Sequence, residues 1–442
     1  MRPIVILLTL VLLASLCGVM FGPSSSHSQG DDVFLNVMAG GAKKLNIAIP
    51  SFTLVGSSDP EKLARKLPEI IGRDLTFSAL FSVVAGTDPV PAEDVAAARK
   101  AWSDFASAGA HAGLHGVLRL RGQQVEAEIR LYDLTSPDQH LIATFTQAAA
   151  SKDHRRLAHK IADEVVYQFT GEPGIASTKI ACLGTAGKSK ELFVMDYDGA
   201  EPSRVTFTEA INLSPAWSPD VRSVAFTSYM HGYPYLYRLF VFEKRPLQTL
   251  AAFPGINSSP AWSPDGKSVA LTLTKDGNPE IYVLNIATGS LRRLTNHWGI
   301  DTEPSWAPTG RELAFVSDRA GAAQIFIMDA EGANVRRLTF GGFKTQPRWS
   351  PRGDVIVYTS RQGTHDLWAV NVDGSNPRQL TAALGSNESA SWAPNGRHLV
   401  FQSNRLGSWH LFTMLADGSE QQPLTRGPGE FTSPSWSPRL PW

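Results

Sequence analysis

The chain has 442 residues, which is long enough for two or more domains with full cores. It is 43% hydrophobic and 19% charged, with a formal net charge of zero. This balance gives no broad electrostatic attraction for nucleic acid or acidic lipid, so we expect no nucleic-acid partner and membrane contact only through other proteins.

The first residues have the pattern of an export signal. Arg2 precedes an apolar run over 4–20, and small polar residues follow it. This pattern predicts a secretory signal peptide over 1–28. An uncleaved membrane anchor is disfavoured because the run is short, and lipid attachment at Cys17 is disfavoured because Leu16 stands where Gly or Ala is preferred. We expect Cys182, the remaining cysteine, to be a buried hydrophobic side chain and no reactive thiol.

Residues 31–173 are predicted to form a small α/β domain. Hydrophobic spacing of 3.6 residues predicts helices, and alternation predicts strands. The expected helices cover 61–75, 92–106 and 155–169, and the expected strands cover 33–37, 45–49, a hairpin over 116–132, and 141–146.

Residues 178–442 contain six copies of one repeat, each marked by a Trp-Ser/Ala-Pro turn signal. The tryptophans recur every 43 to 45 residues, at Trp217, Trp262, Trp306, Trp349, Trp392 and Trp436. A period of this length with β-rich filling is typical of a propeller whose blades are four-stranded sheets. The fold class is therefore an α/β N-terminal domain followed by an all-β six-bladed β-propeller, and we expect the tryptophans to pack between blades.

The two ends of the repeat region predict how the ring closes. The last copy supplies an inner strand alone, and the first copy lacks one. We therefore expect the C-terminal strand to complete the first blade, which removes free sheet edges.

Polar residues stand five positions before five of the six tryptophans, and Phe431 occupies the sixth place. Because they precede the inner strands, we expect them to ring the mouth of the central channel and to form the main binding surface. The polar residues are Asn212, Asn257, Asp301, Lys344 and Asn387.

Catalytic and metal-binding signatures are weak, so we expect no enzyme activity, no cofactor and no metal. The chain has no G-x-S-x-G motif, GTAGKS at 184–189 lacks the first glycine of a phosphate loop, and His111 and His115 lie in a glycine-rich setting. The alternative is an exported enzyme or sugar-binding propeller that uses the central channel, which would require a cluster of channel carboxylates or a metal site.

The order of these parts resembles the TolB family, the periplasmic components of the Tol-Pal system of Gram-negative bacteria. The resemblance rests on the signal peptide, on a domain opening with DVFLNVMAGGAKKLNIAIPSF, and on six SPAWSPDG-type repeats that end at TSPSWSPRL. It implies a periplasmic adaptor without catalysis. The channel mouth would bind Pal, the peptidoglycan-associated lipoprotein, and the N-terminal segment would bind TolA, in support of outer-membrane integrity and cell division.

The resemblance also implies particular contact residues. Thr302 matches a family contact to Pal, whereas Ile256 stands where well-studied members carry histidine, so that contact must differ here. The loops over 253–259 and 300–303 would face Pal, which adds Ser259 and Glu303. The segment over 31–37 would bind TolA through Asp32, Val33, Phe34, Leu35 and Val37.

Overall fold

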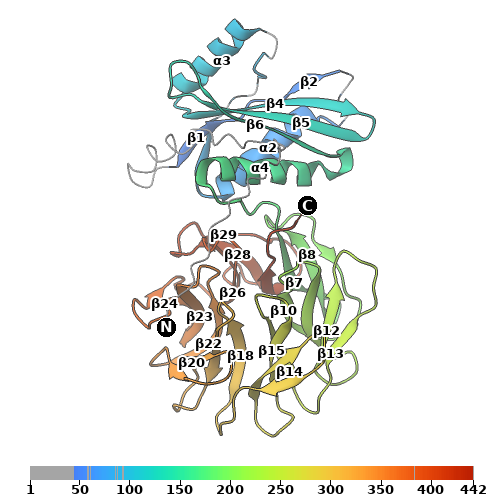
Figure 1. The fold of residues 1–442 in the computed structure, drawn as a ribbon, viewed down its shortest axis with the longest axis vertical. Helices are drawn as coiled ribbons and strands as arrows, with labels where there is room; N and C mark the ends of the chain where they lie inside the picture. Colours follow the sequence, from blue (N-terminus) through green and yellow to red (C-terminus); the bar gives the residue numbers. More distant parts are fainter. Residues whose placement is uncertain are drawn as a thin grey trace, which may run out of the picture.

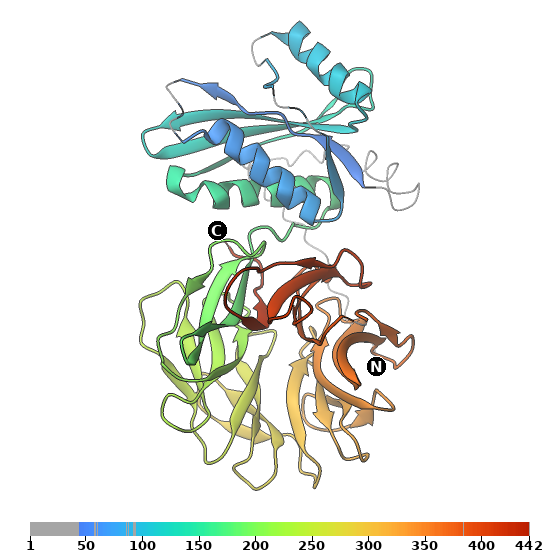
Figure 2. The same ribbon diagram turned by 180° about the vertical axis from the view of Figure 1, so that it is seen from behind.

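The computed structural model describes residues 44–441 apart from 57, 58, 60, 85, 87, 92, 93 and 383. An α/β region lies on one end of a six-bladed β-propeller, as Figures 1 and 2 show from opposite sides. The predicted fold class is therefore confirmed. The predicted signal peptide over 1–28 and the predicted strand over 33–37 lie outside the described residues.

The α/β region contains a six-stranded mixed sheet in the order β3-β1-β4-β5-β6, with β2 also paired to β4. The pairs β1–β3, β1–β4 and β2–β4 are parallel, and β4, β5 and β6 are antiparallel. The predictions missed the short strands β2 and β3 and ended β6 too early. The strands are β1 (Leu45–Ala48), β2 (Thr53–Val55), β3 (Phe81–Val84), β4 (Ala112–Arg121), β5 (Gln124–Asp133) and β6 (Leu141–Ala150).

Three helices cover this sheet, and all three were predicted. Helices α2 (Leu63–Phe77) and α4 (His154–Thr170) lie between the sheet and the propeller, and α3 (Val95–Ser107) lies on the opposite face (Figure 1). The 3-10 turn η1 (Ser151–Asp153) leads into α4. Helix α4 ends at Gly171, whose φ of 70° is the left-handed conformation that favours glycine at a helix end.

Local chemistry explains where α3 begins and how it packs. The carboxylate of Asp94 accepts hydrogen bonds from the backbone N–H groups of Ala96 and Ala97 at 2.9 and 3.0 Å, which caps the helix. Trp102 packs on β4 at Gly113, where a Cβ atom would lie 2.5 Å from the indole. The glycine therefore makes room for the helix on the sheet.

Each propeller blade is a four-stranded antiparallel sheet that runs from the channel outward. The inner strands, each carrying a repeat tryptophan, are β10 (Asn212–Trp217), β14 (Asn257–Trp262), β18 (Asp301–Trp306), β22 (Phe343–Trp349), β26 (Asn387–Trp392) and β30 (Phe431–Trp436). The second strands are β7 (Lys179–Ala186), β11 (Ser223–Ser228), β15 (Ser268–Leu273), β19 (Glu312–Ser317), β23 (Val355–Gln362) and β27 (His398–Ser403). The third strands are β8 (Ser189–Asp196), β12 (Tyr235–Phe240), β16 (Glu280–Asn285), β20 (Gln324–Asp329), β24 (Thr364–Asn371) and β28 (His410–Leu415). The outer strands are β9 (Ser203–Arg204), β13 (Gln248–Ala251), β17 (Leu291–Arg293), β21 (Arg336–Arg337), β25 (Arg378–Gln379) and β29 (Gln422–Pro423).

The ring closes as predicted. Strand β30 pairs with β7, so the blade β30-β7-β8-β9, called the closing blade below, joins the two ends of the repeat region. The repeat tryptophans link neighbouring blades, because the indole N–H groups of Trp262, Trp306 and Trp392 donate to a carbonyl of the preceding inner strand at 3.0–3.2 Å. Packing between blades, the role predicted for the tryptophans, is therefore confirmed for these three.

Candidate partner-binding surfaces

The end of the propeller away from the α/β region, called the far face below, consists of two sets of loops (Figure 1). One set joins each outer strand to the next inner strand, and the other joins second to third strands. The opposite end, called the near face, holds the turns that follow each repeat tryptophan and contacts the α/β region. The far-face loops cover 187–188, 205–211, 229–234, 252–256, 274–279, 294–300, 318–323, 338–342, 363, 380–386, 404–409 and 424–430.

The polar residues predicted to ring the channel mouth do lie at the far-face ends of the inner strands, but their side chains are not exposed. Asn212, Asn257, Asp301 and Asn387 are fully buried, and Lys344 is 4% exposed. The expectation of an exposed polar rim is therefore wrong. Polar side chains in this position form hydrogen bonds or ion pairs inside the propeller. A sequence alone does not show whether a polar side chain contacts other protein groups or solvent.

Asn257 illustrates what these residues do. Its Oδ1 accepts a hydrogen bond from the Phe253 backbone N–H at 2.9 Å, and its Nδ2 donates to the Phe253 carbonyl at 2.8 Å. Asp301 instead forms an ion pair with Arg319, with 2.6 Å between Oδ2 and Nη2. Burial raises the pKa of the Asp301 carboxyl even beside Arg319. These buried groups hold the far-face loops in place, which makes them positioning residues.

Lys344 and Asn387 act in the same way. The Lys344 ammonium donates to Ser360 Oγ at 2.5 Å, and burial lowers its pKa. Asn387 donates to Asp366 Oδ1 at 2.9 Å and accepts from Arg405 Nη2 at 2.7 Å. Each contact joins an inner strand to the loop or strand beside it.

Large apolar side chains are exposed on the far face, beside the buried polar groups at the ends of the inner strands. Trp298 is 74% exposed, Ile300 48% and Ile256 44%. Four of the exposed residues stand six positions before a repeat tryptophan, a regular signal that could have been found in the sequence. The exposed set comprises Phe207, Ile211, Tyr229, Tyr233, Ile256, Trp298, Ile300, Phe340, Phe343, Leu384 and Leu406.

Ser259 and Glu303 lie in the central channel. Both occupy a bulge of their inner strands, with φ of 51° and 55°, and line a cavity of about 280 Å³. Glu303 accepts a hydrogen bond from the Gln346 backbone N–H at 2.6 Å, and burial raises its pKa. Thr302, next to Glu303, is half-buried.

The channel lining is mainly serine, proline and tryptophan, with Glu303 as the one carboxylate among the lining residues that the structure describes. Trp217, Trp262 and Trp306 border the cavity. In the described part of the chain, no group of three His, Cys, Asp or Glu side chains could hold a metal ion. The pair of carboxylates that glycoside hydrolysis uses is therefore not formed by these residues.

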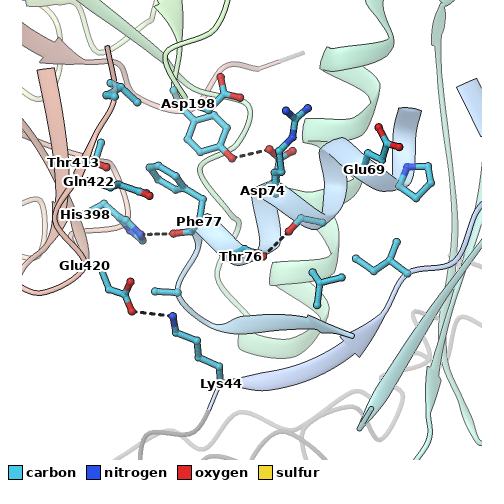
Figure 3. A pocket seen from close by; sticks show the side chains of 18 of the residues that line it. Lys44, Glu69, Asp74, Thr76, Phe77, Asp198, His398, Thr413, Glu420 and Gln422 are labelled. Atoms are coloured by element: carbon cyan, nitrogen blue, oxygen red, sulfur yellow. Dashed lines mark hydrogen bonds and ion pairs between the residues drawn. The ribbon is translucent and has the colours of Figure 1, made fainter. Parts of the chain in front are cut away.

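A second cavity, of about 730 Å³, lies between the α/β region and the propeller (Figure 3). Phe77 of α2 projects into this region beside His398, whose Nε2 donates to the Phe77 carbonyl at 3.0 Å. On the propeller side, the hydroxyl of Thr413 is buried and has no hydrogen-bond partner among the residues that the structure describes. Lys44 lies at the rim and forms an ion pair with Glu420 at 2.9 Å.

A buried charge cluster joins the two regions beside this cavity. The imidazole of His159 on α4 donates to Asp74 on α2 at 2.7 Å and lies 3.6 Å from Asp196 of the closing blade. The Tyr197 hydroxyl also donates to Asp74, at 2.7 Å, and Arg155 pairs with Asp196 at 3.0 Å. Burial lowers the pKa of His159, but its two carboxylate partners raise it to a net value of about 9.

Other sequence signals have structural roles. Cys182 is fully buried, as predicted, and burial raises the pKa of its thiol. GTAGKS forms the tip of the β7–β8 hairpin. His115 is buried in β4, with its Nε2 3.2 Å from Thr53 Oγ1. Asp32, Val33, Phe34, Leu35 and Val37 lie outside the described residues. Over the described residues, the helices are too short or too polar to span a membrane.

Family models match both parts of the chain. The TolB amino-terminal domain model matches residues 33–140, and the TolB beta propeller domain model matches residues 166–440. A crystal structure of TolB from Acinetobacter baumannii is similar, with a TM-score of 0.78 and 28% identity over 90% of this chain and 97% of that one.

Curated relatives are named Tol-Pal system protein TolB. The Gluconobacter oxydans protein is 36% identical over 86% of this chain and 82% of its own length. The Desulfosudis oleivorans protein is 35% identical over 46% of this chain, and that match spans 47% of its length. Several other curated relatives, like the Desulfosudis oleivorans protein, match over about half of their own length. Together with the propeller model, the longer match shows that this chain belongs to the TolB family of the Tol-Pal system.

Proposed function

We propose that this protein is a non-enzymatic periplasmic adaptor of the Tol-Pal system. It binds Pal through the far face of the propeller and TolA through the segment over 31–37, and so supports outer-membrane integrity and cell division. Family membership supports the Tol-Pal role. The observation that carries the binding proposal is the exposed apolar set on the far face.

The composition of the far face favours a protein partner. Monomeric proteins rarely expose large contiguous apolar patches, and protein interfaces are enriched in Trp, Tyr and Phe. Ile256, Trp298 and Ile300 lie on adjacent loops and are all substantially exposed. The Asn257 and Asp301 contacts fix both loops before any partner arrives, which reduces the entropy lost on binding.

A binding measurement with purified Pal tests this proposal. Trp298→Ala and Ile300→Ala should each weaken Pal binding by about tenfold or more, because exposed aromatic and aliphatic anchors carry much of an interface's energy. Tyr167→Ala, at an exposed position of α4, is the matched control and should bind Pal like the wild type. Unchanged affinity in both far-face variants would refute the assignment of this surface.

The cavity between the two regions supports a role for the N-terminal segment. The described chain begins at Lys44, at the rim of the cavity, and the six residues that separate Val37 from Lys44 let the two Cα atoms lie at most about 25 Å apart. We propose that the segment over 31–37 occupies this cavity when TolA is not bound, with its backbone or a polar side chain meeting the unpartnered Thr413 hydroxyl. TolA then competes with the cavity for the segment.

Hydrogen exchange of residues 31–37, measured with and without Pal, tests whether the two binding events are coupled. A change in protection on adding Pal is expected. Thr413→Val removes the hydroxyl at nearly constant volume, and Thr170→Val, at the end of α4, is the matched control. Equal protection with and without Pal would contradict the coupling. Protection that does not change in Thr413→Val would contradict docking of the segment in the cavity.

A further inference from the structure

The charges of the far face are distributed unevenly around the ring. From residue 205 to residue 343, called the apolar sector here, cations are paired: Lys275 lies 2.8 Å from Asp276, and Arg319 lies 2.6 Å from Asp301. The same holds for Arg293, which is 2.9 Å from Glu280. This sector also holds nine of the exposed apolar side chains, from Phe207 to Phe343.

The remaining part of the far face is different. It comprises the end of the β7–β8 hairpin, the end of the β23–β24 hairpin, and the loops over 380–386, 404–409 and 424–430, which belong to three consecutive blades. Four exposed cations here have no ion-pair or hydrogen-bond partner among the residues that the structure describes. These residues, called the basic sector, are Lys188, Lys190, Arg361 and Arg426.

Acidic groups in the same loops do little to balance these charges. Glu388 is half-buried and pairs with His365 at 3.3 Å. Asp366 is buried and holds Asn387 and Thr381. Glu430 is half-buried in the loop that precedes β30. Glu209 is exposed in the adjoining loop, next to Ala210, whose carbonyl accepts the backbone N–H of Lys190. The four cations outnumber these acidic groups that reach solvent, so the basic sector keeps a net positive charge.

Strand pairing fixes the positions of these cations. In four blades the hairpin between the second and third strands pairs over six residues, but the pairing of β7 with β8 and of β23 with β24 continues to the tip. Arg361 lies in a paired position opposite His365, and Lys188 lies in the turn between β7 and β8. Regular hairpins therefore hold Arg361 and Lys188 in fixed positions, which a partner with complementary charges can match.

We propose that the basic sector binds a carboxylate-rich surface or segment of the protein that docks on the apolar sector. This inference rests on the proposed function and specifies the chemistry of the partner: an apolar patch flanked on one side by Asp and Glu side chains. Single exposed ion pairs contribute only about 0.2–1 kcal/mol. The four cations together act mainly by steering association and by orienting the partner on the ring.

Association kinetics with purified Pal test the inference. The triple variant Lys188→Glu/Arg361→Glu/Arg426→Glu should lower the association rate constant about tenfold or more in low salt, and about 0.5 M salt should largely remove the difference. The variant Lys66→Glu/Arg99→Glu/Lys100→Glu reverses three exposed cations of the α/β region and is the control for net charge. Thermal unfolding of all three proteins confirms that each is folded.

The outcomes separate this inference from the proposed function. If the wild type binds Pal and both triple variants associate at the same rate, the basic sector does not steer the partner, while the apolar sector remains its binding surface. If the wild type does not bind Pal, the proposed function fails. Binding of poly-L-glutamate then tests the basic sector: binding lost only in the far-face variant supports a carboxylate site, and equal binding by both variants overturns it.

Discussion

The two ends of the propeller come from the same six repeats, yet they present opposite chemistry. Near-face groups are buried and paired with the α/β region: Asp196 with His159 and Arg155, and His398 with the Phe77 carbonyl. The far face exposes Trp298, Ile256 and other apolar side chains, which no element of the described chain covers. The comparison shows that one end of the ring is committed to an intramolecular contact, and the other end is the one for which we propose partner binding.

Removal of β30 should have the largest effect, because it damages both ends. Deletion of residues 431–442 leaves β7 without its neighbour and opens the ring. We expect the unfolding temperature to fall by at least about 10 °C and trypsin to cleave the propeller rapidly. A truncated protein as resistant to trypsin as the full chain would show that closure does not stabilise the ring.

Asp74→Ala should damage the near-face contact alone. It leaves His159 and the Tyr197 hydroxyl without their buried partner, which should cost about 3 kcal/mol of unfolding free energy. Asp74→Asn keeps an acceptor and should cost less. The affinity of the far face for Pal should stay unchanged in both variants, and a loss of stability confined to the propeller would contradict the role of Asp74 between the regions.

The pH dependence sharpens the comparison further. The folded-state pKa of His159, about 9, lies above its unfolded value, so the stabilisation from its carboxylates is complete below about pH 6.5 and disappears as pH rises through 9. Burial lowers the pKa of His398 to about 4, although its hydrogen bond to Phe77 opposes this. Protonation of the buried imidazole therefore costs stability as pH falls from 6.5 towards 4.

We therefore expect these two histidines to give a stability maximum near pH 6.5, with a loss of up to about 3 kcal/mol on each side. Denaturant unfolding of wild type and His159→Gln across pH 5–10 measures the alkaline side. The difference between the two proteins should shrink as the pH approaches 10. A difference that stays constant would mean that His159 is not charged in the folded protein.

The smallest stability effect is expected on the far face. Trp298 is 74% exposed, so Trp298→Ala should change the unfolding free energy by less than about 0.5 kcal/mol while it weakens Pal binding. Trp262→Ala, at a repeat position 9% exposed, should instead cost about 3 kcal/mol or more. A large stability loss in Trp298→Ala would indicate that this side chain supports the fold.

The sequence predicted the fold best where a regular repeat pattern extends over many residues. The 43–45-residue interval of the tryptophans predicted the six blades, and the incomplete first and last repeats predicted the pairing of β30 with β7. Helix α2 followed from its hydrophobic spacing, and α4 from the Gly171 that ends it. Strands β2 and β3 were missed because three or four residues are too few to show a period.

The candidate site was harder to predict because its chemistry depends on contacts between distant residues. Asp74, His159 and Asp196 are far apart along the chain, and no local pattern brings them together. Asn257 and Asp301 were expected on the surface, but their hydrogen bonds lie inside the blade. The exposed side chains are those of Ile256 and Ile300, one position earlier in each loop. The prediction chose their polar neighbours because it assumed that polar residues in loops are exposed.

The closing blade also constrains the order of events during synthesis. Strand β7 leaves the ribosome early, whereas its partner β30 is made only after all five of the other blades. Until then, one edge of β7 has unsatisfied backbone groups and the first and last blades have not met. The ring is therefore complete only when the last strand of the repeat region has paired with the first.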